Sequence, residues 1–99
     1  MAERKTPAFF PISESEVNHI FPEAEGHVAD TEENRRLLMD VANDDLARLE
    51  SDQYGNEWSA RLLPDGSQAW TQTRLGKIVN GGINVVPRTF NPNTGLKKL

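Results

Sequence analysis

The sequence predicts an α+β domain in which two or three N-terminal helices pack on a twisted antiparallel sheet of about four strands. In the first half of the chain, apolar residues recur at the three- and four-residue spacing of an amphipathic helix. After residue 53 they instead alternate with polar residues, and proline and glycine turns separate the alternating segments. Helices followed by an antiparallel meander are typical of the α+β class.

The first fifty residues are predicted to contain an extended arm and a helical part. Prolines flank two phenylalanines within residues 1–12, which favours an extended arm whose aromatic side chains pack on the core. A short helix is expected over residues 14–21, because Ser13 and Glu16 have the spacing of a capping box and a proline follows. The helical part is predicted to occupy residues 13–50.

A second helix is predicted to begin after Asp30 or Thr31, either of which can cap its N-terminus. Two glutamates then lie at the positive end of the helix dipole, and four apolar residues between positions 37 and 42 form a buried face. Arg35 and Arg36 are expected to point largely outward. Residues 46–49 are expected to form one further helical turn.

The sheet part is predicted to occupy residues 53–99. A Pro-Asp-Gly turn at residues 64–66 and the Leu75-Gly76 pair connect neighbouring strands. Adjacent glycines at residues 81–82 indicate either a β-bulge or a close approach of another backbone segment. The expected strands are residues 58–62, Gln68–Arg74, 77–80 and 83–86.

Composition limits the class of protein to which the chain can belong. Its 99 residues suit a single domain, residues 1–99, with a modest core. The absence of cysteine excludes a disulfide framework, a thiolate nucleophile and a cysteine zinc site. No apolar run is long enough to cross a membrane, and the N-terminus lacks the apolar region of a signal peptide.

Charge is divided unevenly along the chain. Residues 1–50 contain five basic and twelve acidic side chains, whereas residues 51–99 contain six basic and three acidic ones. The formal net charge is −4, yet the second half alone has a net charge of +3. A sheet with a positive field suits a polyanion such as a nucleic acid.

The two histidines, His19 and His27, are candidate proton-transfer groups, because imidazole titrates near neutral pH. His19 lies beside the apolar stripe of the first predicted helix. His27 follows a glycine in the loop before the second helix, where it can face a cleft. Loop placement favours His27, and the alternative for either residue is a hydrogen-bonded structural histidine.

A polar cluster is predicted around the second and third strands, where Thr71, Thr73, Arg74 and Lys77 come within about 5 Å across neighbouring strands. Such a cluster can hold a phosphate and stabilise charge in a transition state. The alternative is a solvated sheet face.

Further candidates follow or adjoin these strands. Arg88 and Thr89 come just after the last strand and are expected to complete the anion site. Trp70 and Phe90 are candidates for stacking on unpaired bases, with burial in the core as the alternative.

No metal site is predicted, because the acidic residues are scattered and the two histidines lack a ligand motif. Residues 80–82 also lack the lysine and hydroxyl of a phosphate-binding loop, so no cofactor is expected. Cleavage of RNA by its own 2′-hydroxyl requires only a base, an acid and a cation. DNA lacks this internal nucleophile, so RNA is the expected substrate of a nuclease built from these residues.

Over residues 17–96 the chain resembles the C-terminal toxin domains of bacterial polymorphic toxin systems, including contact-dependent inhibition and Rhs-type effectors. Within these, it is most similar to ribonucleases of the barnase/EndoU/colicin/RelE superfamily, whose members often cleave tRNA. The segments with this resemblance are GHVADTEENRRLL (26–38), YGNEW (54–58), LPDGSQAWTQTR (63–74), GKIVNGGIN (76–84) and PRTFNPNTG (87–95).

The resemblance implies N-terminal helices on a twisted antiparallel sheet. It also implies an active site with a helix-side histidine, a basic strand residue and a hydroxyl near the last strand. The implied partners are RNA, most often tRNA, and a cognate immunity protein, and the implied place of action is the bacterial cytoplasm after delivery within a larger secreted protein. The matching catalytic positions are His27 or His19, Arg74 and Thr89, with Lys77, Arg88, Thr71 and Trp70 as substrate-binding residues.

Two alternatives remain open from the residues alone. The first is a non-catalytic protein-binding module, such as an immunity or antitoxin-like protein or a phage-encoded inhibitor, because the low net charge and the Trp and Tyr content suit a protein–protein surface. The second is a toxin of the same delivery class that acts on DNA or by another chemistry.

Overall fold

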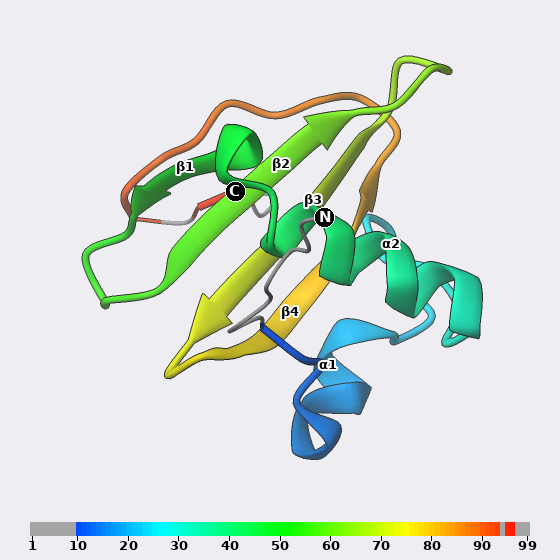
Figure 1. The fold of residues 1–99 in the computed structure, drawn as a ribbon. Helices are drawn as coiled ribbons and strands as arrows, with labels where there is room; N and C mark the ends of the chain where they lie inside the picture. Colours follow the sequence, from blue (N-terminus) through cyan, green and yellow to red (C-terminus); the bar gives the residue numbers. More distant parts are fainter. Residues whose placement is uncertain (1–9, 94, 97–99) are drawn as a thin grey trace, which may run out of the picture.

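The computed structural model describes residues 10–93, 95 and 96, and it has the predicted α+β architecture (Figure 1). The four strands form one antiparallel sheet in the order β1-β2-β3-β4. The elements are η1 (Glu14–Glu16), α1 (Val17–Ile20), α2 (Glu32–Ala42), η2 (Asp45–Ala47), β1 (Arg48–Ser51), β2 (Glu57–Leu62), β3 (Gln68–Arg74) and β4 (Lys77–Asn84).

Helix α2 covers one face of the sheet and forms as expected. The Thr31 hydroxyl caps it by accepting a hydrogen bond from the backbone N–H of Asn34 at 3.1 Å. Leu38 and Val41 are fully buried on its inner side, and they pack in clusters with Ile78 and Ala69 of the sheet. None of the helices in the described part of the chain is long and apolar enough to cross a membrane.

The segment before α2 differs from expectation in its capping. Residues 14–20 are helical, but the Ser13 side chain makes no cap hydrogen bond. Its backbone is used instead at the sheet edge, where the Ser13 N–H donates to the Ile78 carbonyl and the Ile78 N–H donates to the Pro11 carbonyl, at 3.0 and 2.9 Å. The end of the predicted arm thus extends the sheet beside β4, and residues 1–9 of that arm lie outside the described residues.

Two predicted boundaries in the sheet were wrong. The helical turn expected over residues 46–49 is η2, which ends at Ala47, and residues 48–51 form strand β1. The strands expected over residues 77–80 and 83–86 are one strand, β4, and residues 85–86 lie beyond its end. The bulge lies at Val79 rather than at the glycines, because Gln72 pairs with Asn80 while Thr73 pairs with Ile78.

The second face of the sheet is covered by the C-terminal segment, which runs along the side opposite α2 in Figure 1. Leu96 is buried there in a cluster with Trp58 and Trp70, whose rings stack at 5.5 Å between centroids. Strand β3 is therefore buried on both faces, with only Arg74 exposed. The alternation of apolar and polar residues after residue 53 did not reveal this second layer.

The adjacent glycines permit a close backbone approach, one of the two alternatives that the sequence offered. A Cβ atom at Gly82 would collide with the carbonyl oxygen of Gly26. The same carbonyl accepts a hydrogen bond from the Trp70 indole N–H at 3.2 Å. The loop before α2 is thereby held against β4 and the buried tryptophan.

We expect Thr71→Val to raise the free energy of unfolding by about 1 kcal/mol. The Thr71 side chain is fully buried and its hydroxyl has no hydrogen-bond partner among the described residues, so an apolar side chain of the same shape removes an unsatisfied group. Urea unfolding of the purified domain measures the change.

Thr73→Val is the matched control, because the Thr73 hydroxyl on the same face donates to the Glu57 carbonyl at 3.4 Å. This variant should be less stable than wild type by about 1 kcal/mol, and so less stable than Thr71→Val by about 2 kcal/mol. Equal effects of the two substitutions would contradict the assignment of an unsatisfied hydroxyl to Thr71.

Candidate functional site

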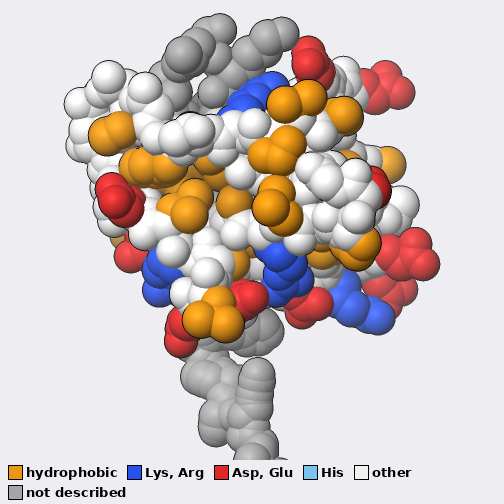
Figure 2. All heavy atoms as spheres, turned by 90° about the horizontal axis from the view of Figure 1, so that it is seen from above, with side chains coloured by type: hydrophobic (Ala, Val, Ile, Leu, Met, Phe, Trp, Pro, Cys, Tyr) orange, Lys and Arg blue, Asp and Glu red, His pale blue; other side chains and the backbone are white. Residues whose placement is uncertain are grey.

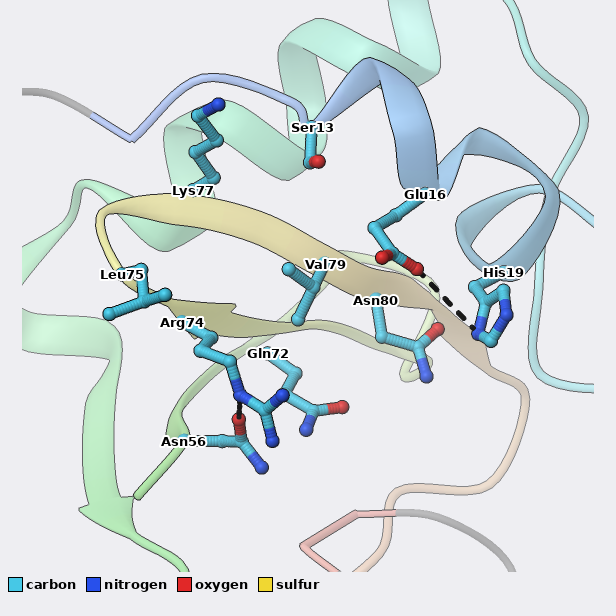
Figure 3. A pocket seen from close by; sticks show the side chains of 10 residues that line it. All are labelled: Ser13, Glu16, His19, Asn56, Gln72, Arg74, Leu75, Lys77, Val79 and Asn80. Carbon is cyan, nitrogen blue, oxygen red and sulfur yellow. Dashed lines mark hydrogen bonds and ion pairs between the residues drawn. The ribbon is translucent and has the colours of Figure 1, made fainter. Parts of the chain in front are cut away.

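A pocket of about 550 Å³ opens at the end of the β3–β4 hairpin, beside η1 and α1 (Figure 3). The sheet contributes arginine, lysine and amide side chains, and the helical segment contributes a histidine and a carboxylate. The lining residues are Ser13, Glu16, His19, Asn56, Gln72, Arg74, Leu75, Lys77, Val79 and Asn80.

The Val79 bulge determines which β4 side chains line this pocket. Without an extra residue, Ile78 and Asn80 would point to the same face of the strand. With the bulge, Ile78 is fully buried in the cluster beneath α2, whereas Asn80 lies beside Gln72 on the pocket side. The bulge thus places an amide in the pocket and an isoleucine in the core.

Arg74 is held in the pocket by a chain of buried polar groups. Its Nε donates to the Asn56 side-chain oxygen at 2.8 Å, and the Asn56 amide nitrogen donates to an Asp52 carboxylate oxygen at 3.0 Å. Asn56 is 4% exposed, so its orientation is fixed on both sides. The remaining guanidinium nitrogens of Arg74 lie at the pocket, where they can bind an anion.

The Asp52 carboxylate is the origin of this chain. Burial alone would raise its pKa, but hydrogen bonds from the Trp58 indole, from the side chain and backbone of Asn56 and from the Tyr54 backbone outweigh burial and lower the pKa. Asp52 therefore remains ionised, and it anchors both Trp58 and the asparagine that holds Arg74.

His19 and Glu16 face the pocket from the helical segment. His19 Nδ1 lies 3.9 Å from Glu16 Oε1, and their side chains are 72% and 38% exposed. Figure 3 shows this pair at one end of the pocket and Lys77 at the other. The side chains of His19 and Glu16 are therefore both accessible to solvent and to a molecule bound in the pocket, as a proton-transfer pair requires.

His27, the histidine favoured by the sequence, does not line this pocket. Its Nδ1 lies 3.0 Å from the Ile20 carbonyl oxygen and 2.9 Å from the Gly81 carbonyl oxygen. Because both are acceptors, Nδ1 carries the proton and joins the end of α1 to β4. The ring also packs edge-on against Trp70 at 5.7 Å. His27 is therefore a hydrogen-bonded structural histidine, which is the alternative that the sequence offered.

The predicted cluster of Thr71, Thr73, Arg74 and Lys77 is divided between two faces. Thr71 and Thr73 are buried on the α2 side, at 0% and 6% exposure, whereas Arg74 and Lys77 are exposed at the pocket. Trp70 is 2% exposed, because it is buried in the cluster with Trp58 and Leu96. It therefore does not offer a ring face to a base. Burial thus corrects the substrate-binding roles expected of Thr71 and Trp70.

Arg88 and Thr89 lie at the opposite end of β3. The Arg88 backbone bonds to the Gln68 side chain in both directions at 3.0 Å, and its guanidinium donates to the Leu96 carbonyl at 3.3 Å. Gln68 precedes Arg74 by six residues, or about 20 Å of strand. Arg88 therefore fixes the C-terminal segment, and exposed Thr89 lies apart from the pocket.

Five polar lining residues were missed from the sequence: Ser13, Glu16, Asn56, Gln72 and Asn80. Two had a usable signal. Glu16 precedes His19 by three residues on one helical face, and Gln72 shares a strand face with Arg74. Asn56 had none, because its role depends on the fold of the loop around Asp52. Among the described residues, no three His, Cys, Asp or Glu side chains gather as a metal site.

Comparison of the chain with protein-family models, with curated proteins and with solved structures found no match.

We expect Asp52→Asn to lower the free energy of unfolding by about 2 kcal/mol at pH 7, because an amide NH₂ would face the donors of Asn56 and Trp58. The folded-state pKa of Asp52 is lowered, so its carboxylate stabilises the fold above about pH 4 and loses this effect as the pH falls further. Thermal unfolding from pH 7 to pH 2.5 measures this dependence.

The difference between wild type and Asp52→Asn should therefore narrow below about pH 4. Asp65→Asn is the control, since the pKa of that exposed turn carboxylate is also lowered, by hydrogen bonds from Ser67 within its own turn that do not join it to the pocket. A difference for Asp52→Asn that stays constant over the whole pH range would contradict the assigned role.

Proposed function

We propose that the pocket at the end of the β3–β4 hairpin is the active site of an endoribonuclease. In the proposed reaction, the 2′-hydroxyl of the RNA itself attacks the adjacent phosphate. The observation that carries the proposal is that a histidine, a carboxylate, a positioned guanidinium and a lysine line one solvent-accessible pocket. These groups supply the base, acid and cations that the reaction needs. The positive net charge of the sheet half adds support, since it favours a polyanionic substrate.

Each group has a defined role in this proposal. The Glu16 carboxylate accepts the proton of the 2′-hydroxyl, whose oxygen attacks the adjacent phosphorus. The His19 imidazolium gives a proton to the departing 5′-oxygen. Arg74 and Lys77 bind the phosphate oxygens and stabilise the additional negative charge of the transition state. The products are a 2′,3′-cyclic phosphate and a free 5′-hydroxyl, so atoms and protons balance without a further reactant.

The biological setting that we propose is that of a bacterial toxin domain. It acts on RNA, with tRNA as the expected class, in the cytoplasm of a target bacterium, and a cognate immunity protein neutralises it. Support for this setting comes from the sequence resemblance over residues 17–96. The proposed catalytic residues are His19 and Arg74, which the sequence had offered as candidates, together with Glu16.

A protein-binding module is the second candidate, and exposed apolar side chains favour it. Figure 2 shows apolar side chains gathered on the face seen from above, bordered by charged ones. Leu62, Val85 and Val86 are 66%, 82% and 73% exposed, and Leu62 and Val85 lie at the same end of the sheet. Exposed apolar groups of this kind suit a protein contact. The same surface is compatible with an immunity protein bound to a toxin.

We expect His19→Ala and Arg74→Ala each to reduce RNA cleavage at least ~100-fold, because each removes a proton donor or a cation that acts in the transition state. Cleavage of total bacterial RNA and of purified tRNA by the isolated domain, followed on denaturing gels, measures the effect. Folding of each variant is checked by thermal unfolding.

Asn18→Ala and Arg36→Ala are the matched controls. Asn18 is the exposed neighbour of His19, and Arg36 is an exposed arginine on α2 whose contact is with Glu32. Both variants should retain wild-type activity, as should Thr89→Ala. Intact RNA with the wild-type domain, together with unimpaired growth of bacteria that express it, would instead favour the protein-binding module.

A further inference from the structure

We propose that Gln72 recognises the base of the bound nucleotide, with adenine preferred, while Arg74 binds the adjoining phosphate. This inference rests on the proposed function, since it names the substrate feature that the same pocket selects. Gln72 lies at the pocket between Asn56 and Asn80, and the pocket lining includes all three amides.

The first reason is that the Gln72 side chain has no hydrogen-bond partner among the residues that the structure describes. Asn56 uses both ends of its amide, toward Arg74 and Asp52, and the Asn80 oxygen accepts the Gly81 N–H at 2.9 Å. Gln72 is only 8% exposed, yet its side-chain amide makes no hydrogen bond with any residue that the structure describes. The amide atoms of Gln72 are not among the buried polar atoms that lack a partner, so they are open to the pocket, where a ligand can bind them.

The second reason is the position of Gln72 relative to Arg74. The two residues are two positions apart on β3, so their side chains emerge on the same face, about 7 Å apart along the strand. Figure 3 shows the Gln72 carboxamide beside the Arg74 guanidinium. A neutral amide next to a fixed cation suits a ligand in which a polar heterocycle is attached close to a phosphate, which is the description of a nucleotide.

The third reason is the chemistry of the amide. A carboxamide presents one donor and one acceptor side by side, and this pair matches the N7 acceptor and N6 amino donor of adenine. Guanine presents two acceptors on that edge, so its O6 would face the amide oxygen of Gln72. Leu75 and Val79 add apolar lining for the ring. Leu75 is 94% exposed and has a φ of 54°, a left-handed conformation unusual for leucine, at the rim of this pocket.

The test compares the binding of adenosine 3′-monophosphate, guanosine 3′-monophosphate and inorganic phosphate by NMR titration. Wild type should bind the adenosine nucleotide about 5- to 100-fold more tightly than the guanosine nucleotide. Gln72→Glu, which keeps the size but replaces the donor with an acceptor, should remove most of this preference. Gln72→Met should do the same without a new charge, and phosphate binding should change less than threefold in that variant.

Gln53→Glu is the control, because it makes the same change at an exposed glutamine whose amide contacts Tyr54. It should leave the adenine preference unchanged. Equal affinity of wild type for the two nucleotides, or an unchanged preference in both Gln72 variants, would overturn the inference.

Failure of the inference and failure of the proposed function are distinguishable. RNA cleavage without any base preference at the cut sites would refute the role of Gln72 and leave the ribonuclease in place. Selective binding of adenosine 3′-monophosphate by a domain that does not cleave RNA would retain the role of Gln72 and refute the ribonuclease.

Discussion

The Asp52 carboxylate is the group on which the rest of the site depends. It accepts hydrogen bonds from the Trp58 indole and the Asn56 amide. It thereby joins the tryptophan cluster on the face opposite α2 to the pocket. Asn56 then holds the Nε of Arg74. A charged acceptor with several donors is more rigid than any single pair, because loss of one contact does not release the others. The orientation of the exposed arginine is therefore set by a buried acid two contacts away.

Two layers on opposite faces of the sheet explain why the pocket lies where it does. Helix α2 covers one face, and the C-terminal segment with Leu96 covers the other, so β3 has no broad open face. The far end of β3 is closed by the hydrogen bonds between Gln68 and Arg88. The hairpin end of β3 and β4 is left open, and it is there that the Val79 bulge directs Asn80 toward the pocket.

Local sequence signals predicted the fold class, α2 with its Thr31 cap, strand β3 and the Leu75-Gly76 turn, because each depends on residues close in the chain. They did not predict strand β1, which forms through pairing with β2 despite its four exposed residues. Burial of Trp70 was one of the two alternatives that the sequence offered, whereas the burial of Thr71 was missed for a similar reason. Leu96 covers one face of β3 and α2 covers the other, and both are distant from β3 in the sequence. His27 was favoured because of its loop, but the carbonyls that bind its ring belong to α1 and β4.

We propose that the pocket cleaves RNA by way of the 2′-hydroxyl, and cleavage of two matched oligonucleotides tests this proposal. One is an RNA that the purified domain cuts at a mapped position, and the other has a single 2′-deoxynucleotide immediately 5′ to that bond. We expect the RNA to be cleaved with a 2′,3′-cyclic phosphate end, and the oligonucleotide with the 2′-deoxynucleotide to remain uncut at the substituted position. Equal cleavage of both oligonucleotides would contradict it, because the internal nucleophile would then be dispensable.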